Sequence, residues 1–263
     1  MTANALAQSS IDMRLYKLDC GNIKILDANI LDTSNSYAGA VTLKSSCYVI
    51  KHGEDYMLWE AGFNPQAIEK SSEEDMFQPF IRETIPQALE KIDLKPEDIT
   101  KIGISNMHFD NIGQANLFSH ATLYMGWEDY NFLFNVPLLP QGFHPEFIDE
   151  WADGKNVVIV KDKTDIFGDG RVVMIPTPGH TLGHNSLLVN LEKSGSYLLS
   201  GDLWHVQENM ENNRVPDFSK NPTLNRQTGE RVKNWAENNN VKVIIQHDPR
   251  HFEEIPDLPE FLD

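Results

Sequence analysis

Residues that could bind a metal ion follow four separate segments of this 263-residue chain. In chain order, the candidates are His108 with Asp110, then His180, Asp202 and His247. Imidazole nitrogens and carboxylate oxygens are common protein ligands of divalent transition metals. Because the loops at the ends of strands carry the functional residues of layered sheet folds, these side chains are predicted to meet at one sheet edge.

The segments that must position these residues have the patterns of strands and turns. His108 and Asp110 follow the apolar run Ile102–Ile104, so in an extended segment their alternating positions would point both side chains the same way. His180 lies in a turn punctuated by Pro and Gly, and the other two candidates each follow a short apolar run. The pattern therefore predicts a site at strand ends.

Each candidate also has a purely structural interpretation. A single His after a strand is more often a surface or hydrogen-bonded core residue than a ligand. Asp202 fits a turn residue after Ser200 and Gly201, and His184 fits a helix or strand cap. The ordered series His-x-Asp, Pro-Gly-His-Thr, Gly-Asp and His-Asp is more specific than any of its parts and favours a metal site.

This series resembles the metal signature of the metallo-β-lactamase superfamily, whose HxHxDH motif appears here as Asn-Met-His-Phe-Asp-Asn over residues 106–111. The resemblance covers nearly the whole chain and points to the N-acyl homoserine lactonase branch. Further matching stretches are Leu15–Gly21, Ser46–Ile50, Met57–Gly62, Ser200–His205 and Arg214–Pro216. The resemblance implies an α/β fold, the αββα sandwich of two mixed β-sheets flanked by helices.

The resemblance also implies two divalent metal ions, usually zinc, bridged by one Asp. Carried over position by position, the ligands of the first metal would be Asn106, His108, His180 and Asp202. The ligands of the second metal would be Asp110, Asn111, His247 and Asp202.

Three residues depart from the pattern of that family. Asn106 and Asn111 stand where it has His, and a carboxamide oxygen binds zinc less well than imidazole does, although it suits harder ions somewhat better. Glu60 stands where the family usually has an Asp that supports a ligating His, and such partners typically change affinity or activity about 10–100-fold. Together the three substitutions indicate an altered site in which each half has lost a strong ligand.

The implied reaction is the hydrolysis of a lactone or ester. Two adjacent cations lower the pKa of a shared water and polarise a carbonyl, which favours hydroxide attack. Asp110 and His205 are the candidate catalytic residues. His205 lies where related lactonases place a Tyr or His, and it is predicted to donate to the developing oxyanion or leaving oxygen. The alternative for His205 is a structural His packed beside Trp204.

The leading hypothesis is thus a metal-dependent lactone or ester hydrolase, with N-acyl homoserine lactone as the substrate that the resemblance implies. One alternative is a protein of this fold with a weakened or lost metal site that acts as a non-catalytic binding module. Another is a hydrolase that uses one metal ion, or iron or manganese, on a different carbonyl substrate. Acyl chain length, metal identity and oligomeric state stay open, and a homodimer is one of the alternatives.

Composition narrows the class of partner. The chain has 22 Lys and Arg against 39 Asp and Glu, a formal net charge of −17, which repels nucleic acids and anionic membranes and favours neutral or cationic substrates. No apolar run approaches the roughly 18 residues that span a bilayer, so a soluble protein is expected. Without a linker or repeat, residues 1–263 are predicted to form one domain, with residues 1–12 as a flexible extension.

The two cysteines and the first residues leave the cellular compartment open. Cys20 and Cys47 lie in or beside apolar segments without CxxC spacing, so buried thiols are expected, with one disulfide as the alternative in an oxidising compartment. Ala5-Leu6-Ala7 resembles a processing site, but the charged and long apolar regions of a complete signal peptide are missing. Both a cytoplasmic and a periplasmic or secreted location fit.

Apolar periodicity and turn residues predict the remaining elements. Strands are expected at residues 23–27, 47–50, 56–59, 121–124, 157–160 and 172–175, with a hairpin over 186–199 and a last strand before His247. Helices are expected over residues 65–92 and 223–238. This interleaving suits a layered αββα sandwich.

An aromatic-rich stretch from Trp127 to Phe147 is the candidate wall of an apolar substrate pocket. Its members are Tyr130, Phe132, Phe134, Phe143 and His144. Packing against the core or against a second subunit would use the same residues, so the sequence leaves these uses open.

Overall fold

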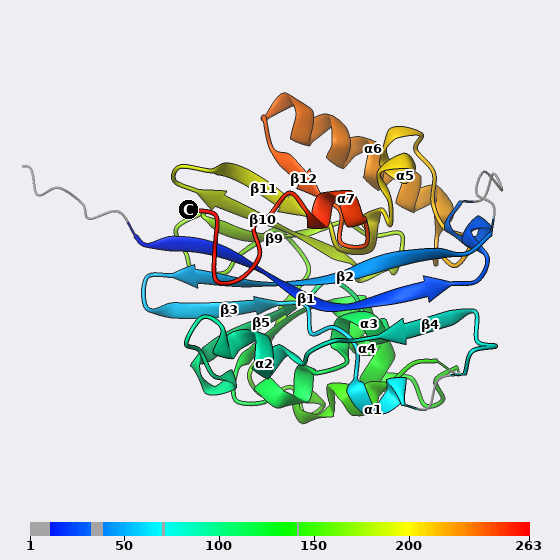
Figure 1. Ribbon diagram of the computed structural model, residues 1–263, viewed down its shortest axis with the longest axis horizontal. Coiled ribbons are helices and arrows are strands. Elements are labelled where there is room, and N and C mark those ends of the chain that lie inside the picture. Colours follow the sequence, from blue (N-terminus) through cyan, green and yellow to red (C-terminus); the bar gives the residue numbers. More distant parts are fainter. Residues whose placement is uncertain (1–10, 33–38, 70–71, 141) are drawn as a thin grey trace, which may run out of the picture.

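Two β-sheets packed face to face form the centre of the molecule, as the computed structural model shows for residues 11–32, 39–69, 72–140 and 142–263 (Figure 1). The larger sheet has seven strands in the order β4-β1-β2-β3-β5-β6-β7. Its strands are β1 (Met13–Ile25), β2 (Val41–His52), β3 (Asp55–Trp59), β4 (Phe77–Phe80), β5 (Ile99–Ile104), β6 (Thr122–Gly126) and β7 (Val157–Val160). It is mixed, because β1, β2 and β3 pair antiparallel and β3, β5, β6 and β7 pair parallel.

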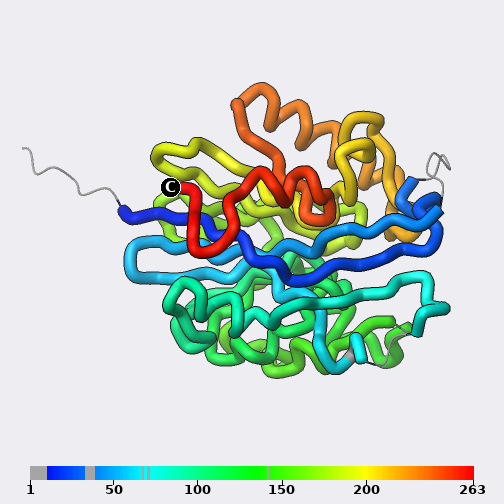
Figure 2. Tube along the Cα trace, viewed as in Figure 1, coloured from blue at the N-terminus to red at the C-terminus, as the bar shows by residue number. Residues whose placement is uncertain are grey.

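The second sheet has five strands in the order β12-β11-β10-β9-β8 and is also mixed. Its strands are β8 (Thr164–Asp165), β9 (Val172–Pro176), β10 (Asn185–Leu191), β11 (Gly195–Leu199) and β12 (Lys242–Ile244). The C-terminal segment returns to the larger sheet, where Leu262 and Leu15 exchange backbone hydrogen bonds of 2.8 and 3.0 Å (Figure 2).

Helices cover the outer faces of the two sheets, so the predicted αββα sandwich is confirmed. Figure 1 shows α1 (Pro65–Ile68), α2 (Ile85–Glu90), α3 (Phe109–Ile112) and α4 (Trp127–Asn135) beside the larger sheet. It shows α5 (Gln207–Glu211) and α6 (Pro222–Asn238) on the opposite side, while α7 (Pro249–Phe252) follows β12. None of the helices in these residues is long and apolar enough to cross a membrane.

The strands of the larger sheet are apolar on both faces because both faces are buried. In β3, Met57 and Trp59 pack into the core between the sheets, whereas Leu58 packs into the core under the helices. In β2, Val49 packs into the core under the helices and Ile50 packs into the core between the sheets. Alternating side chains of one strand thus fill two cores, which places the sheet in the middle of the layers.

Most predicted elements are found, and two expectations are wrong. The 186–199 hairpin, the 223–238 helix and most of the strands agree with the structure to within a few residues. β1 begins ten residues before the strand predicted at 23–27, and β2 begins six residues before the strand predicted at 47–50. Residues 65–92 are not largely helical, because β4 interrupts them and pairs with β1 at the sheet edge. His108 and Asp110 do not leave a strand end in extended form, since His108 is the N-cap of α3 and Asp110 lies within that helix.

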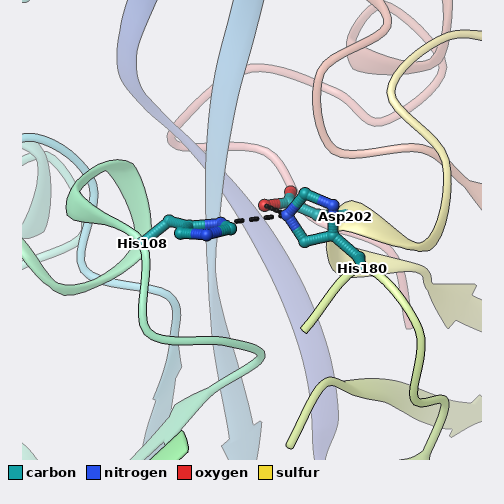
Figure 3. Close-up of side chains that lie close together, drawn as sticks. All are labelled: His108, His180 and Asp202. Carbon is teal, nitrogen blue, oxygen red and sulfur yellow. Dashed lines mark hydrogen bonds and ion pairs between the residues drawn. The ribbon is translucent and has the colours of Figure 1, made fainter. Parts of the chain in front are cut away.

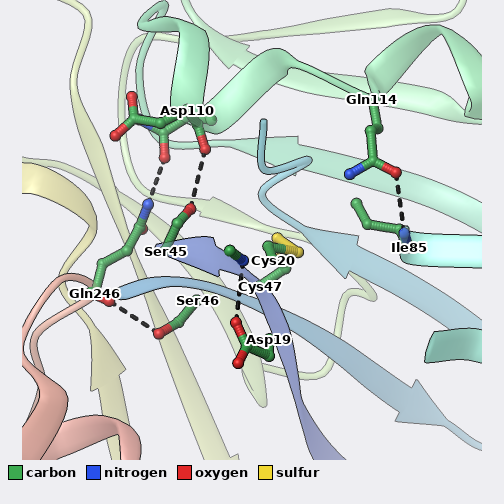
Figure 4. Close-up of a disulfide and its surroundings, with 11 residues drawn as sticks. Asp19, Cys20, Ser45, Ser46, Cys47, Ile85, Asp110, Gln114 and Gln246 are labelled. Carbon is green, nitrogen blue, oxygen red and sulfur yellow. Dashed lines mark hydrogen bonds between the residues drawn. A yellow bond between two sulfur atoms is a disulfide. The ribbon is translucent and has the colours of Figure 1, made fainter. Parts of the chain in front are cut away.

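A disulfide joins Cys20 of β1 to Cys47 of β2, which is the alternative to the expected free thiols (Figure 4). Both cysteines are buried, and their Cα atoms lie 5.7 Å apart in neighbouring strands. The two residues before Cys47 in β2 touch the segments that carry the site: Ser46 Oγ donates to Gln246 O at 2.9 Å, and Ser45 Oγ donates to Asp110 O at 3.3 Å. The expected processing site Ala5–Ala7 lies outside the described residues.

Candidate metal centre

His108, His180 and Asp202 come from three separate loops and meet at one point (Figure 3). His180 Nε2 lies 2.9 Å from His108 Nδ1 and 3.3 Å from Asp202 Oδ2. The position of each residue is set by the helix or strands next to it. His108 is the N-cap of α3, His180 lies in the β9–β10 loop and Asp202 follows β11. One ligand atom from each lies within 4.8 Å of the others, which makes a first three-residue cluster.

A second cluster shares Asp202 and adds His205 and His247, again with ligand atoms within 4.8 Å of one another. His247 Nε2 lies 2.9 Å from Asp202 Oδ1 and 3.4 Å from Asp110 Oδ2. Its other ring nitrogen, Nδ1, bonds to the Lys44 carbonyl oxygen. A backbone acceptor on one ring nitrogen orients the other, as it commonly does in metal-binding histidines.

Burial and mutual charge set the ionisation of the two clusters. Burial lowers the pKa of His108 to about 3 and also lowers that of His205, so both rings are neutral. Burial opposes ionisation of Asp202, but His247 and His180 hold its pKa well below the usual range. Burial likewise opposes the charged form of His247, yet Asp202 and Asp110 raise its pKa to about 9. The site thus combines the neutral rings of His108 and His205 with an ionised Asp202 carboxylate and a protonated His247 ring.

Asp110 lies at the edge of the second cluster, where its carboxylate faces His247. Burial and the neighbouring Asp202 raise the pKa of Asp110 to about 6, and His247 counteracts part of that shift. The side chain also lines the cavity described below.

Asn106 and Asn111 both contact Asp202 through their amide nitrogens. Asn106 Nδ2 donates to Asp202 Oδ2 at 2.9 Å, and Asn111 Nδ2 donates to the same oxygen at 3.2 Å. Their own oxygens are engaged elsewhere: Asn106 Oδ1 accepts from the His108 backbone N–H at 3.0 Å, and Asn111 Oδ1 accepts from Gln246 Nε2. The structure therefore places both predicted ligands beside Asp202, but as hydrogen-bond donors to it.

Glu60 supports the site from behind the first cluster. Its side chain is fully buried, its backbone has a positive φ of 67°, and its two carboxylate oxygens accept from the Ser105 N–H at 3.2 and 3.3 Å. Burial raises the pKa of Glu60 well above its usual range, although the Ser105 hydrogen bond opposes this. Glu60 thus fixes the backbone directly before Asn106.

Two further residues position the ligand loops. His184 Nε2 accepts the Asp202 backbone N–H at 2.9 Å, so this His acts as a cap for the Asp202 loop. Asp129 accepts from Met107 N at 3.1 Å, Thr181 Oγ1 at 2.6 Å and Gly183 N at 2.9 Å, which ties the His108 loop to the His180 loop. The sequence offered the cap interpretation for His184, but no local pattern marks Asp129.

The two clusters lie on the floor of a cavity of about 1290 Å³ with largely apolar walls. The lining includes Ile23, Ile25, Leu43, Phe63, Phe77, Phe109, Phe143, Phe147 and Phe218. Among the aromatic residues predicted to form this wall, Phe143 and His144 line it, whereas Tyr130 packs in the core and bonds to Trp151 O at 2.9 Å. Phe143 lies 6.1 Å from the His108 ring, and Phe218 lies 5.3 Å from the His205 ring.

The residues present fit a divalent metal ion. In the described part of the chain, His180 Nδ1 and His205 Nδ1 are buried without a hydrogen-bond partner. Buried polar atoms normally find partners, so unpartnered atoms in a His/Asp cluster call for an explanation such as an ion. Imidazole nitrogens around a shared carboxylate are a donor set suited to zinc and similar transition metals.

Comparisons with known proteins identify the family of the chain. The sequence profile of the Metallo-beta-lactamase superfamily matches residues 41–246. The chain is 24% identical over 268 residues to the N-acyl homoserine lactonase AttM of Azorhizobium caulinodans, covering 96% of this chain and 99% of that protein. It is 26% identical over 262 residues to an N-acyl homoserine lactonase of Bacillus cereus, covering 95% and 98%.

Solved structures show the same fold. An N-acyl homoserine lactone hydrolase with the product N-hexanoyl-L-homoserine bound at its catalytic metal centre superposes with a TM-score of 0.81 at 23% identity, over 95% of this chain and 98% of that one. AidC, a dizinc quorum-quenching lactonase, gives a TM-score of 0.71 at 15% identity, over 90% and 88%.

Proposed function

Because the chain belongs to the metallo-beta-lactamase superfamily, we propose that it is a metal-dependent hydrolase that opens a lactone or a similar ester. The observation that carries this proposal is the pair of clusters that share Asp202 on the floor of an apolar cavity. The names of its relatives, lactonases matched over nearly their whole length, support the same reaction class.

Divalent cations, zinc in the first instance, would be held by His108, His180 and Asp202 on one side. On the other side, His247 and Asp110 would join Asp202. Such cations polarise a carbonyl and lower the pKa of a water molecule when they are bound. The chain's own residues then orient the substrate, exclude water from its apolar part and move protons.

Asp110 is placed to move a proton between water and the leaving oxygen. Its carboxylate lines the cavity and lies beside His247. A carboxylate in that position can accept a proton from the attacking water at Oδ and return it to the leaving alkoxide of the opened ring. This role makes Asp110 a catalytic residue of the proposed reaction.

An N-acyl homoserine lactone fits the distribution of polarity in the cavity. The polar floor meets the lactone ring, and the apolar wall with Phe143, Phe147 and Phe218 covers an acyl chain. Such a substrate carries no charge, which suits a protein with a formal net charge of −17.

The hydrogen bonds of Asn106 and Asn111 favour a second candidate, a binding module without hydrolysis. These two amides already satisfy Oδ2 of Asp202, so the carboxylate has partners when no cation is present. In that case the cavity would hold a lactone or ester without opening it.

Metal content and turnover separate these candidates. The protein is purified without chelator, its metals are counted by mass spectrometry, and lactones, aryl esters and organophosphates are assayed with zinc, manganese and iron. Near two equivalents of metal together with chelator-sensitive lactone opening supports the proposal. One equivalent with turnover indicates a mono-metal hydrolase. Lactone binding without turnover or metal, under metal-replete conditions, would replace the proposal with the binding module.

A further inference from the structure

We propose that His205 is a metal ligand in this chain and takes the place left by Asn111 in the second half of the centre. The second cation would then be held by Asp202, His205 and His247 together with Asp110. This inference rests on the proposed metal-dependent function and assigns His205 a role different from the oxyanion donor predicted from the sequence.

Asn111 is turned away from ligation by its neighbours. Its oxygen accepts from Gln246 Nε2, and its nitrogen donates to Asp202 Oδ2 at 3.2 Å. A carboxylate only accepts hydrogen bonds, so this contact keeps the amide nitrogen toward the cluster and the oxygen away from it. An amide nitrogen that donates in this way offers no lone pair to a cation.

His205 is close to Asp202 and His247, two of the residues that remain in this half. Its ring stacks on His247 with centroids 5.2 Å apart and an angle of 18° between the planes, and one of its ring nitrogens belongs to the cluster with Asp202 and His247. The ring also lies 5.0 Å from His180. His205 therefore reaches the centre from the loop directly after Asp202, a different direction from that of Asn111 on α3.

The state of the His205 ring suits a ligand. The residue is 5% exposed, and its Nδ1 is buried with no hydrogen-bond partner. A donor to substrate oxygen alone would leave this buried nitrogen unexplained.

The backbone of His205 is anchored independently of any substrate. Its N–H donates to Asn209 Oδ1 at 3.3 Å, and Asn209 Nδ2 donates to Leu31 O at 2.9 Å. Phe218 stands edge-on to the ring from the cavity side. A ring fixed in this way is preorganised for a cation, since ligand positions must be held by their surroundings.

The test compares zinc binding by the wild type and His205→Phe, which keeps an aromatic ring on His247 but removes both nitrogens. Zinc stoichiometry and affinity are measured by competition with a chromophoric chelator, and the cobalt-substituted proteins are compared by visible absorption. We expect two equivalents in the wild type and one in His205→Phe, with the second site weakened by more than about 100-fold, beyond the usual effect of an outer partner.

Two controls make the result specific. Asn111→Ala is expected to keep both equivalents of zinc. His52→Phe removes a histidine that pairs with Asp169 and is not part of the site, so it should bind zinc like the wild type. Two equivalents of unchanged affinity in His205→Phe, or loss of one in Asn111→Ala, overturns the inference. So does a wild type that binds a single equivalent.

A measurement on the wild-type protein covers the case in which His205→Phe does not fold. Zinc is titrated into protein with ¹⁵N-labelled, sequence-assigned histidines, and the ring nitrogens of His205 should shift with the second equivalent together with those of His247. An unchanged His205 overturns the inference. Lactone opening by the wild type is assayed separately and tests the proposed function. Turnover by a protein whose His205 ring nitrogens do not shift refutes only the ligand assignment. Two bound equivalents of zinc without turnover refute only the proposed hydrolase activity.

Discussion

Asn106 donates a hydrogen bond of 2.9 Å from Nδ2 to Oδ2 of Asp202, across the gap between the ends of β5 and β11. The same amide accepts the His108 N–H through its oxygen, which fixes its orientation. A neutral donor stabilises an ionised carboxylate, although less than a divalent cation does. Asn106 therefore donates to the Asp202 carboxylate, which His247 and His180 keep ionised, and contributes no nitrogen lone pair to the first cluster.

Replacing Asn106 by His should strengthen metal binding by the first cluster. Asn106→His adds an imidazole beside His108, His180 and Asp202, so zinc affinity is expected to rise by at least about 10-fold. Chelator competition measures the change, with Asn106→Ala as the control that removes the hydrogen bond without adding a ligand. Equal affinities in Asn106→His and the wild type would mean that this position does not reach the cation.

Replacing Asp202 by Asn should abolish metal binding and weaken the metal-free fold. The buried carboxylate pairs with His180 and His247, and removing one member of a buried ion pair typically costs about 3–5 kcal/mol. The free energy of unfolding is measured by urea denaturation in the presence of chelator, beside Asp162→Asn at an exposed position. If both variants unfold like the wild type, Asp202 is not the electrostatic centre of the site.

Phe143→Ala should impair long-chain substrates selectively. Phe143 lines the apolar wall beside His108, and burying a side chain of this size contributes about 1.5–3 kcal/mol. KM for a decanoyl lactone is expected to rise about 10-fold or more, with little change for a butanoyl lactone. Leu138→Ala, at a residue that is 86% exposed, is the control. Equal losses for both lactones would indicate a disturbed metal centre.

Reducing the disulfide should destabilise the protein. Cys20 and Cys47 are 27 residues apart in the chain, and closing a loop of that length stabilises a fold by about 3–4 kcal/mol in the chain-entropy account. Urea denaturation with and without dithiothreitol measures the difference. The double variant Cys20→Ser/Cys47→Ser should be insensitive to the reductant, and a wild type that is equally insensitive would contradict the prediction.

The sequence by itself determined the fold class and pointed to the residues of the candidate centre. The alternating apolar residues of β2 and β3 predict strands, because the side-chain period of a strand is two. The spacing of His108, Asp110, His180, Asp202 and His247 resembled one superfamily closely enough to imply the sandwich. These are local patterns or ordered motifs, so they can be recognised without knowing the tertiary contacts of the residues.

Only the tertiary structure decided the contacts between segments that are distant in the chain. Residues 77–80 became a strand because β1 offered an edge to pair with, which no local propensity reports. The pairing of β1 with β2 brought Cys20 to Cys47. Packing likewise turned Asn111 toward Gln246 and stacked His205 on His247, 42 residues away, and these contacts determine which side chains are left to bind a cation.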